Sequence, residues 1–167
     1  MTIYRWGILA TGNVAGDMAQ ALQTSPQAEV LAVASRQKHK ALAFGERWGI
    51  PRCYDTYQDL SEDPDVDIVY IATPHNFHAE NIRMCLEAGK HVLCEKAFTL
   101  NASQAQACID LARRRSLFLM EAMWMRFFPA IDQVRCWLAD GAIGEVRLVQ
   151  ADFCFNLPFD PQHRLYN

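Results

Sequence analysis

Residues 1–20 read MTIYRWGILATGNVAGDMAQ and pass from an apolar run into small and polar residues. The apolar run over 3–9 has the length of a buried strand, and a helix is expected over 13–23. A dinucleotide-binding fold places small residues in the pattern G-x-G-x-x-G/A at such a turn, where the backbone approaches a pyrophosphate. The sequence predicts this turn, with its three small positions at Ala10, Gly12 and Ala15.

The first of these positions is alanine instead of glycine, which weakens the pattern. Alanine can serve at Ala10 if the turn needs no positive φ. A small-residue loop after a strand is also common as a purely structural turn. The loop by itself therefore leaves the function open.

The rest of the first 120 residues alternates apolar runs of strand length with stretches of helical period. This alternation is typical of βαβ units on a parallel sheet, so the fold class expected is α/β, a Rossmann-type doubly wound parallel sheet. The expected strands are 3–9, 29–34, 67–72, 91–95 and 117–120, and the expected helices are 13–23, 38–48, 76–88 and 101–114.

The character of the sequence changes after residue 120. Residues 121–140 predict an aromatic-rich helical segment, and EVRLVQADFCFN over 145–156 predicts one long strand. We therefore expect a dinucleotide-binding domain over 1–120. Residues 121–167 would hold a linking helix and the first strand of a truncated α+β domain for substrate binding or dimerisation. An unpaired strand edge of this kind favours self-association, so a homo-oligomer is expected.

Composition excludes several classes of function. The formal net charge is −3, whereas nucleic-acid-binding domains usually carry a basic excess. No apolar run approaches the roughly 18 residues that span a bilayer, and no signal peptide is evident, so a cytoplasmic protein is expected. The six cysteines include no CxxC pair and mostly lie in apolar runs, which favours buried reduced thiols over disulfides or zinc ligands.

The end of the second expected strand bears on the choice of cofactor. NAD-binding enzymes usually carry Asp or Glu there, hydrogen-bonded to the ribose. Here the strand ends in Ala34, Ser35 and Arg36, with Lys38 close by and no carboxylate. Ser35 and Arg36 could hold a 2′-phosphate through charge-assisted hydrogen bonds, so the sequence predicts NADP, with NAD less favoured. The alternative is a solvated basic start of a helix.

Two further motifs, ATPHNFH over 72–78 and CEKAFTLN over 94–101, follow later strands. Ligands of open parallel sheets bind at the carboxyl ends of strands, so both motifs are expected on the same edge as the small-residue loop. Lys96 could orient a substrate hydroxyl or pass its proton, or be an ordinary surface lysine. His75 and His78 have no acidic or cysteine partner at ligand spacing, so no metal site is expected.

The combination of these motifs resembles the Gfo/Idh/MocA oxidoreductases, which include glucose–fructose oxidoreductase and inositol dehydrogenase. The final stretch resembles most the branch that contains dimeric trans-dihydrodiol dehydrogenase and NADP-xylose dehydrogenase. The resemblance implies a two-domain enzyme that moves hydride between NADP and a hydroxyl carbon of a sugar, cyclitol or diol. The matching stretches, in chain order, are WGILATGNVA, AVASR, ATPHNFH, GKHVLCEK and LFLMEAMWMRFFPA.

The resemblance also implies roles for individual residues. Lys96 matches the family's catalytic lysine, within a Glu-Lys-Pro motif whose proline is Ala97 here, so the backbone at Lys96 loses a restraint. The residues implied at the cofactor are Ala10, Thr11, Gly12, Asn13, Val14, Ser35, Arg36, Lys38, Thr73, Pro74, Asn76, His78, Glu95, Lys96, Trp124 and Arg126.

Two alternatives to an active enzyme stay open at this stage. The chain could be a non-catalytic dinucleotide-binding or regulatory module, or a folded relic with a defective loop at Ala10. Family members are longer than this chain, so it could bind dinucleotide without a complete active site. Substrate identity and the direction of hydride transfer cannot be read from these residues.

Overall fold

The computed structural model describes residues 2–154, 156, 158, 159 and 161. The chain divides into two units, residues 1–123 and 124–167. The strands of the first unit are β1 (Tyr4–Leu9), β2 (Ala28–Ala34), β3 (Arg52–Tyr54), β4 (Ile68–Ile71), β5 (His91–Cys94) and β6 (Leu119–Glu121). Its helices are α1 (Asn13–Gln23), α2 (Lys38–Trp48), α3 (Tyr57–Glu62), the 3-10 helix η1 (His75–Phe77), α4 (His78–Glu87) and α5 (Ala102–Arg115).

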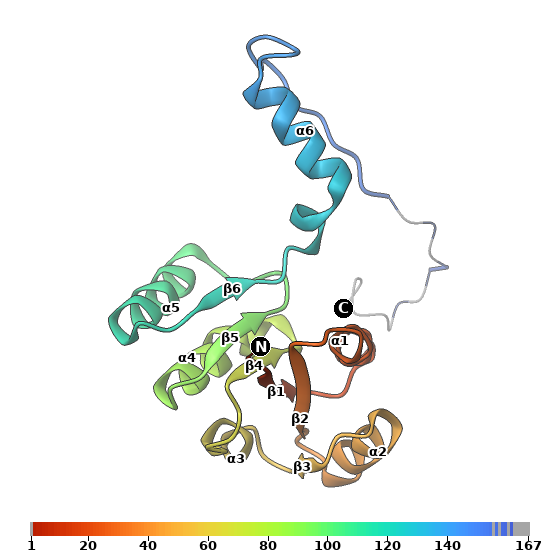
Figure 1. Cartoon of the computed structure of the whole chain (residues 1–167), viewed down its shortest axis with the longest axis vertical. Coiled ribbons are helices and arrows are strands. Elements are labelled where there is room, and N and C mark those ends of the chain that lie inside the picture. The colour runs from red at the N-terminus through yellow and green to blue at the C-terminus, as the bar shows by residue number, and fades with distance from the viewer. Residues whose placement is uncertain (1, 155, 157, 160, 162–167) are drawn as a thin grey trace. The chain divides into compact units, whose positions relative to one another are not determined.

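The six strands form one sheet in the order β3-β2-β1-β4-β5-β6 (Figure 1). Every neighbouring pair is parallel. This is the strand order of a Rossmann fold. The chain builds the sheet outward from β1 to β3 and then returns to place β4 on the other side of β1, so the switch in strand order lies between β1 and β4. The predicted doubly wound parallel sheet is confirmed, and its switch point identifies the carboxyl ends of β1 and β4 as the place for a ligand.

Helices cover both faces of the sheet because successive side chains of each strand point to opposite sides. One apolar cluster contains Ile8 of β1 and buried side chains of α1 and α2. The other contains Leu9 of the same strand and buried side chains of α3, α4 and α5. The strands between them read as continuous apolar runs since both of their faces are covered.

Two short elements of the first unit were not expected from the sequence. β3 has three residues and α3 has six, which is too short for a hydrophobic period to show. α3 nevertheless begins at a good capping residue, since the Thr56 hydroxyl accepts a 3.0 Å hydrogen bond from the Asp59 amide. The other predicted elements of this unit agree with the structure to within a few residues at each end.

Charged residues close the amino ends of the strands. Arg5, in β1, pairs with Asp65 and Asp67 at 3.0 and 3.1 Å. Arg52, at the start of β3, pairs with Asp63 and Asp65, both at 2.7 Å. The arginine and aspartate side chains at the amino ends of the strands therefore serve as one another's ion-pair partners.

The second unit contains the 3-10 helix η2 (Trp124–Phe127) and α6 (Pro129–Ala139). Trp124 and Phe128 meet edge to face, with ring centroids 5.0 Å apart. The strand expected over 145–156 is not present in its described residues, 145–154 and 156. A strand needs a neighbour to take its backbone hydrogen bonds, and the described residues of this unit include no other strand.

The cysteines and apolar helices agree only partly with expectation. Cys85, Cys94 and Cys108 are buried, as expected, whereas Cys136 and Cys154 are exposed. Burial raises the pKa of the Cys85 thiol to about 12, which keeps it protonated and unreactive. Within the described part of the chain, no helix has the length and apolar character needed to cross a bilayer.

Candidate cofactor site at the carboxyl ends of the strands

The loop between β1 and α1 has an unusual backbone at its first small residue. Ala10 adopts a φ of 79°, so the condition under which alanine was expected to serve, a turn without positive φ, is not met. The left-handed region favours glycine because it brings Cβ too close to the backbone, and Ala10 is therefore strained. Its amide still donates a 2.9 Å hydrogen bond to the Ala34 carbonyl at the end of β2, which holds the turn.

The next small residue leaves the loop open to a ligand. Gly12 is the N-cap of α1, with φ −77°, and a Cβ built on it would meet no atom of the described residues within 4 Å. None of the described side chains caps this helix, and its first turn has no acidic residue. Asn13 and Val14 at the helix start are exposed. The loop thus offers backbone N–H groups and the positive end of the helix dipole, a combination that binds phosphate.

The end of β2 lies beside β1 and carries the predicted 2′-phosphate residues. Ser35 is buried, and its hydroxyl accepts a 3.4 Å hydrogen bond from the Gln37 amide. Arg36 is exposed, with Cζ 5.4 Å from the centroid of the Phe77 ring. Lys38 begins α2 and is also exposed. No carboxylate follows the strand before Lys38, so a phosphate would meet positive charge alone on this short segment.

The loop after β4 is organised by one buried histidine. His78 is fully buried, with Nε2 2.8 Å from the Thr73 carbonyl and Nδ1 2.9 Å from the Ala97 carbonyl. Asn81 donates a 2.9 Å hydrogen bond from Nδ2 to the Thr73 hydroxyl. Pro74 and Asn76 of the same loop are exposed. His78 therefore joins the loop after β4 to the loop after β5.

The loop after β5 carries Glu95 and the predicted catalytic lysine. Tyr70 donates a 2.6 Å hydrogen bond from its hydroxyl to Glu95 Oε1, and the Lys96 amide donates one of 3.2 Å to Oε2. Burial, together with the Glu95 carboxylate, raises the pKa of Tyr70 well above its usual range. The Lys96 side chain is exposed and has no hydrogen-bond or ion-pair partner among the described residues. Its ammonium is free to meet a ligand while its backbone is held.

The contact of His78 with Ala97 bears on the missing proline of the family motif. We expected the backbone at Lys96 to lose a restraint because residue 97 is alanine. The peptide bond between Lys96 and Ala97 is cis, and the Ala97 carbonyl is tied to the buried His78 ring. Phe98 is held as well, since its amide donates a 2.8 Å hydrogen bond to Glu121. Side chains thus restrain the residues on both sides of Ala97.

The structure places most of the predicted site residues at one edge of the first unit. Trp124 and Arg126 lie in η2 of the second unit, and their part in cofactor binding stays a prediction. Sequence reasoning missed Tyr70, which is hydrogen-bonded to Glu95, and Phe77, which stands inside a quoted motif and contacts Arg36. The predicted residues that follow β1, β2, β4 and β5 are Ala10, Thr11, Gly12, Asn13, Val14, Ser35, Arg36, Lys38, Thr73, Pro74, Asn76, His78, Glu95 and Lys96.

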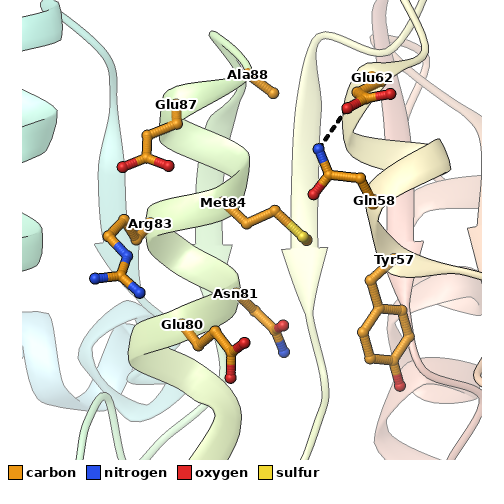
Figure 2. A pocket seen from close by; sticks show the side chains of 9 residues that line it. All are labelled: Tyr57, Gln58, Glu62, Glu80, Asn81, Arg83, Met84, Glu87 and Ala88. Carbon is orange, nitrogen blue, oxygen red and sulfur yellow. Dashed lines mark hydrogen bonds between the residues drawn. The ribbon is translucent and has the colours of Figure 1, made fainter.

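A groove of about 500 Å³ lies elsewhere, between α3 and α4 (Figure 2). Asn81 and Met84 of α4 point toward α3, where Gln58 and Glu62 are hydrogen-bonded to each other. The groove runs along the two helices, and residues 10–14 of the loop after β1 do not line it. Among the described residues, no group of three His, Cys, Asp or Glu side chains is placed to hold a metal ion.

The geometry of the first unit agrees with a known family. A sequence model described as the oxidoreductase family with an NAD-binding Rossmann fold matches residues 4–123. The chain belongs to the Gfo/Idh/MocA oxidoreductase family. The matched region coincides with the first unit, so the six-stranded sheet and the carboxyl-end loops are the family's cofactor-binding fold.

Similar proteins of this family are longer than the chain. It is 43% identical over 160 residues to trans-1,2-dihydrobenzene-1,2-diol dehydrogenase of Homo sapiens, and 42% identical to the Macaca fascicularis protein of that name. Each alignment covers 95% of the chain and 48% of the relative. KijD10, a 3-ketoreductase from Actinomadura kijaniata solved with NADP, is 39% identical with a TM-score of 0.80, covering 87% of this chain and 47% of that one. The chain thus spans about half the length of these relatives.

Proposed function

We propose that this chain is the cofactor-binding half of an NADP-dependent oxidoreductase that transfers hydride between NADP and a hydroxyl carbon of a sugar, cyclitol or diol. The observation that carries the proposal is the open loop at Gly12 after β1, together with Arg36 after the neighbouring β2, whose end has no carboxylate. KijD10 binds NADP, and the mammalian relatives are named for a diol, which supports both the cofactor and the substrate class.

Each loop of the site has a distinct part in this proposal. Residues 10–14 hold the pyrophosphate through backbone N–H groups. Ser35, Arg36 and Lys38 hold the 2′-phosphate through hydroxyl and cationic donors. Thr73, Pro74, Asn76 and His78 form the wall of the site after β4, with only His78 and Thr73 buried. Trp124 and Arg126 are proposed to close over the cofactor from the second unit.

Lys96 is the proposed catalytic residue. When bound, the nicotinamide supplies the carbon that accepts or returns hydride. In the reducing direction the Lys96 ammonium would donate a proton to the substrate oxygen, and in the oxidising direction the neutral amine would accept the hydroxyl proton, while Glu95 fixes the lysine backbone. This role requires a lysine with an accessible side-chain nitrogen and a restrained backbone. Lys96 has an exposed side chain and a hydrogen-bonded amide.

The proposed activity is tested by following NADP reduction with a panel of diols, aldoses and cyclitols. Turnover that Lys96→Ala abolishes, with NADPH affinity retained, supports the oxidoreductase. The assay uses a protein that also carries the second half found in the longer relatives, and NADPH binding without turnover of any panel member there favours a binding module instead. A cytoplasmic location and a homo-oligomer stay predictions. Light scattering on the purified chain addresses the oligomer, and a sharp monomer peak at high concentration contradicts it.

A further inference from the structure

We propose that the Phe77 ring positions Arg36 for the 2′-phosphate of the cofactor. The inference rests on the proposed NADP function and deepens it, since it concerns what makes Arg36 selective. Arg36 follows β2 and Phe77 ends η1, so two separate segments meet at one guanidinium.

Phe77 supplies a fixed surface for the guanidinium. Its ring centroid lies 5.4 Å from Arg36 Cζ, within the range of a cation–π contact. The ring is half-buried, and its amide donates a 2.9 Å hydrogen bond to the Pro74 carbonyl. The next residue, the buried His78, is tied to two loops. The ring therefore stands on a turn that is held from both sides.

The orientation of Arg36 depends on this ring. Arg36 is itself exposed, and a surface arginine has many orientations open to it. The contact with the Phe77 ring restricts them.

Restricting Arg36 favours the binding of NADP over NAD. A guanidinium that is already oriented loses little freedom when it pairs with a phosphate, and preorganisation of this kind strengthens binding. NAD has a hydroxyl where NADP has the 2′-phosphate and gains little from the same guanidinium. The contact between Phe77 and Arg36 is thus expected to set the ratio of the two affinities without touching the reacting atoms.

The test compares dissociation constants for NADPH and NADH, followed by cofactor fluorescence, in Phe77→Leu. We expect NADPH to bind roughly three- to tenfold more weakly, with the NADH constant unchanged. Phe77→Tyr keeps the ring and should restore the wild-type ratio. Phe118→Leu is a matched control. Phe118 is 57% exposed, and it precedes β6, the outermost strand on the side of the sheet away from β2 and β3. It should change neither constant.

A double variant separates positioning from a structural role. In an Arg36→Ala background, Phe77→Leu should have no further effect on NADPH, because the residue it positions is gone. Equal weakening of NADPH and NADH by Phe77→Leu, or additive effects of the two changes, overturns the inference. Unaltered NADPH affinity in Phe77→Leu, with a wild-type protein that still depends on Arg36, overturns the positioning by Phe77 and leaves the proposed function standing.

Discussion

The Nδ1 atom of His78 lies 2.9 Å from the Ala97 carbonyl oxygen, which ties the start of α4 to the loop that carries Lys96. The opposite ring nitrogen lies 2.8 Å from the Thr73 carbonyl oxygen. A neutral imidazole has one N–H and donates to only one of these carbonyls, whereas an imidazolium donates to both. In either form, the ring spans two of the loops that make the proposed cofactor site.

We predict that His78→Ala lowers the free energy of unfolding by about 2 to 4 kcal/mol, because it removes a buried side chain and leaves the Thr73 and Ala97 carbonyls without its ring nitrogens. Urea unfolding measures the change. His39→Ala is the matched control, since His39 is exposed on α2, and it should shift stability by less than about 0.5 kcal/mol. Equal, small effects of the two changes would show that the bridge between loops contributes nothing.

Gly12→Ala should separate binding from folding. The added Cβ meets no atom of the described residues within 4 Å, and φ at this position is −77°, so stability should stay within about 0.5 kcal/mol of wild type. The same methyl group occupies space that the pyrophosphate needs, and NADPH should bind roughly tenfold more weakly or worse. Fluorescence titration and thermal unfolding are compared with Gly16→Ala, whose Cβ has the Trp48 ring as its nearest contact at 3.4 Å. NADPH affinity unchanged in Gly12→Ala argues against a pyrophosphate at this loop.

Ala10→Gly should stabilise the protein, although most changes to glycine do the reverse. The φ of 79° strains alanine, and relief of that strain exceeds the added freedom of the unfolded chain, for a net gain of about 0.5 to 1 kcal/mol. Ala21→Gly, at an exposed position of α1, should instead cost about 1 kcal/mol. Chemical denaturation of both variants gives the comparison. A loss of stability in Ala10→Gly contradicts the strained turn.

Acid should destabilise the first unit through the charges at the amino ends of its strands. Hydrogen bonds from Arg52 and Tyr54 hold the pKa of Asp63 below its ordinary 3.8 although burial opposes them, and Arg5 lowers the pKa of Asp67. A folded-state pKa below the unfolded value means that this stability is present above that value and is lost as pH falls through the folded pKa.

The measurement for this pH dependence is the urea midpoint from neutral pH down to about pH 3. Wild type should lose stability steeply below about pH 5. Asp63→Asn should be less stable at neutral pH and converge on wild type in acid, because it lacks a carboxylate to protonate. Asp110→Asn is a control on α5, where the carboxylate only accepts a hydrogen bond from Gln106, and it should follow the wild-type profile. Parallel curves for Asp63→Asn and wild type would contradict the role of Asp63.

The sequence was sufficient for the long, regular parts of the fold. The helices over 13–23 and 38–48 agree with the structure residue for residue, because each has a full hydrophobic period and a clear end. β3 and α3 have too few residues to show a period. The sequence over 145–156 alternates between two faces as a strand would, yet it has no neighbouring strand among the described residues. Pairing with a neighbour decides strand formation more than the alternation does.

The part of the candidate site that follows from the order of strands and loops along the chain could be predicted. A parallel sheet places every strand's carboxyl end at one edge, so Gly12, Arg36 and Lys96 could be assigned to that edge from the sequence. Contacts between distant segments could not be assigned, as the meeting of Arg36 with Phe77 shows. The positive φ of Ala10 was also beyond reach, because a side chain there predicts the opposite backbone.

The central claim is that Arg36 makes this a site for NADP. Its most direct test is the ratio of dissociation constants for NADPH and NADH, measured by cofactor fluorescence at low salt for wild type and Arg36→Ala. We predict that the wild-type protein binds NADPH more tightly than NADH. Arg36→Ala should lose most of this preference, with NADH affinity nearly unchanged. Equal affinities in the wild-type protein, or a preference that survives in Arg36→Ala, would contradict it.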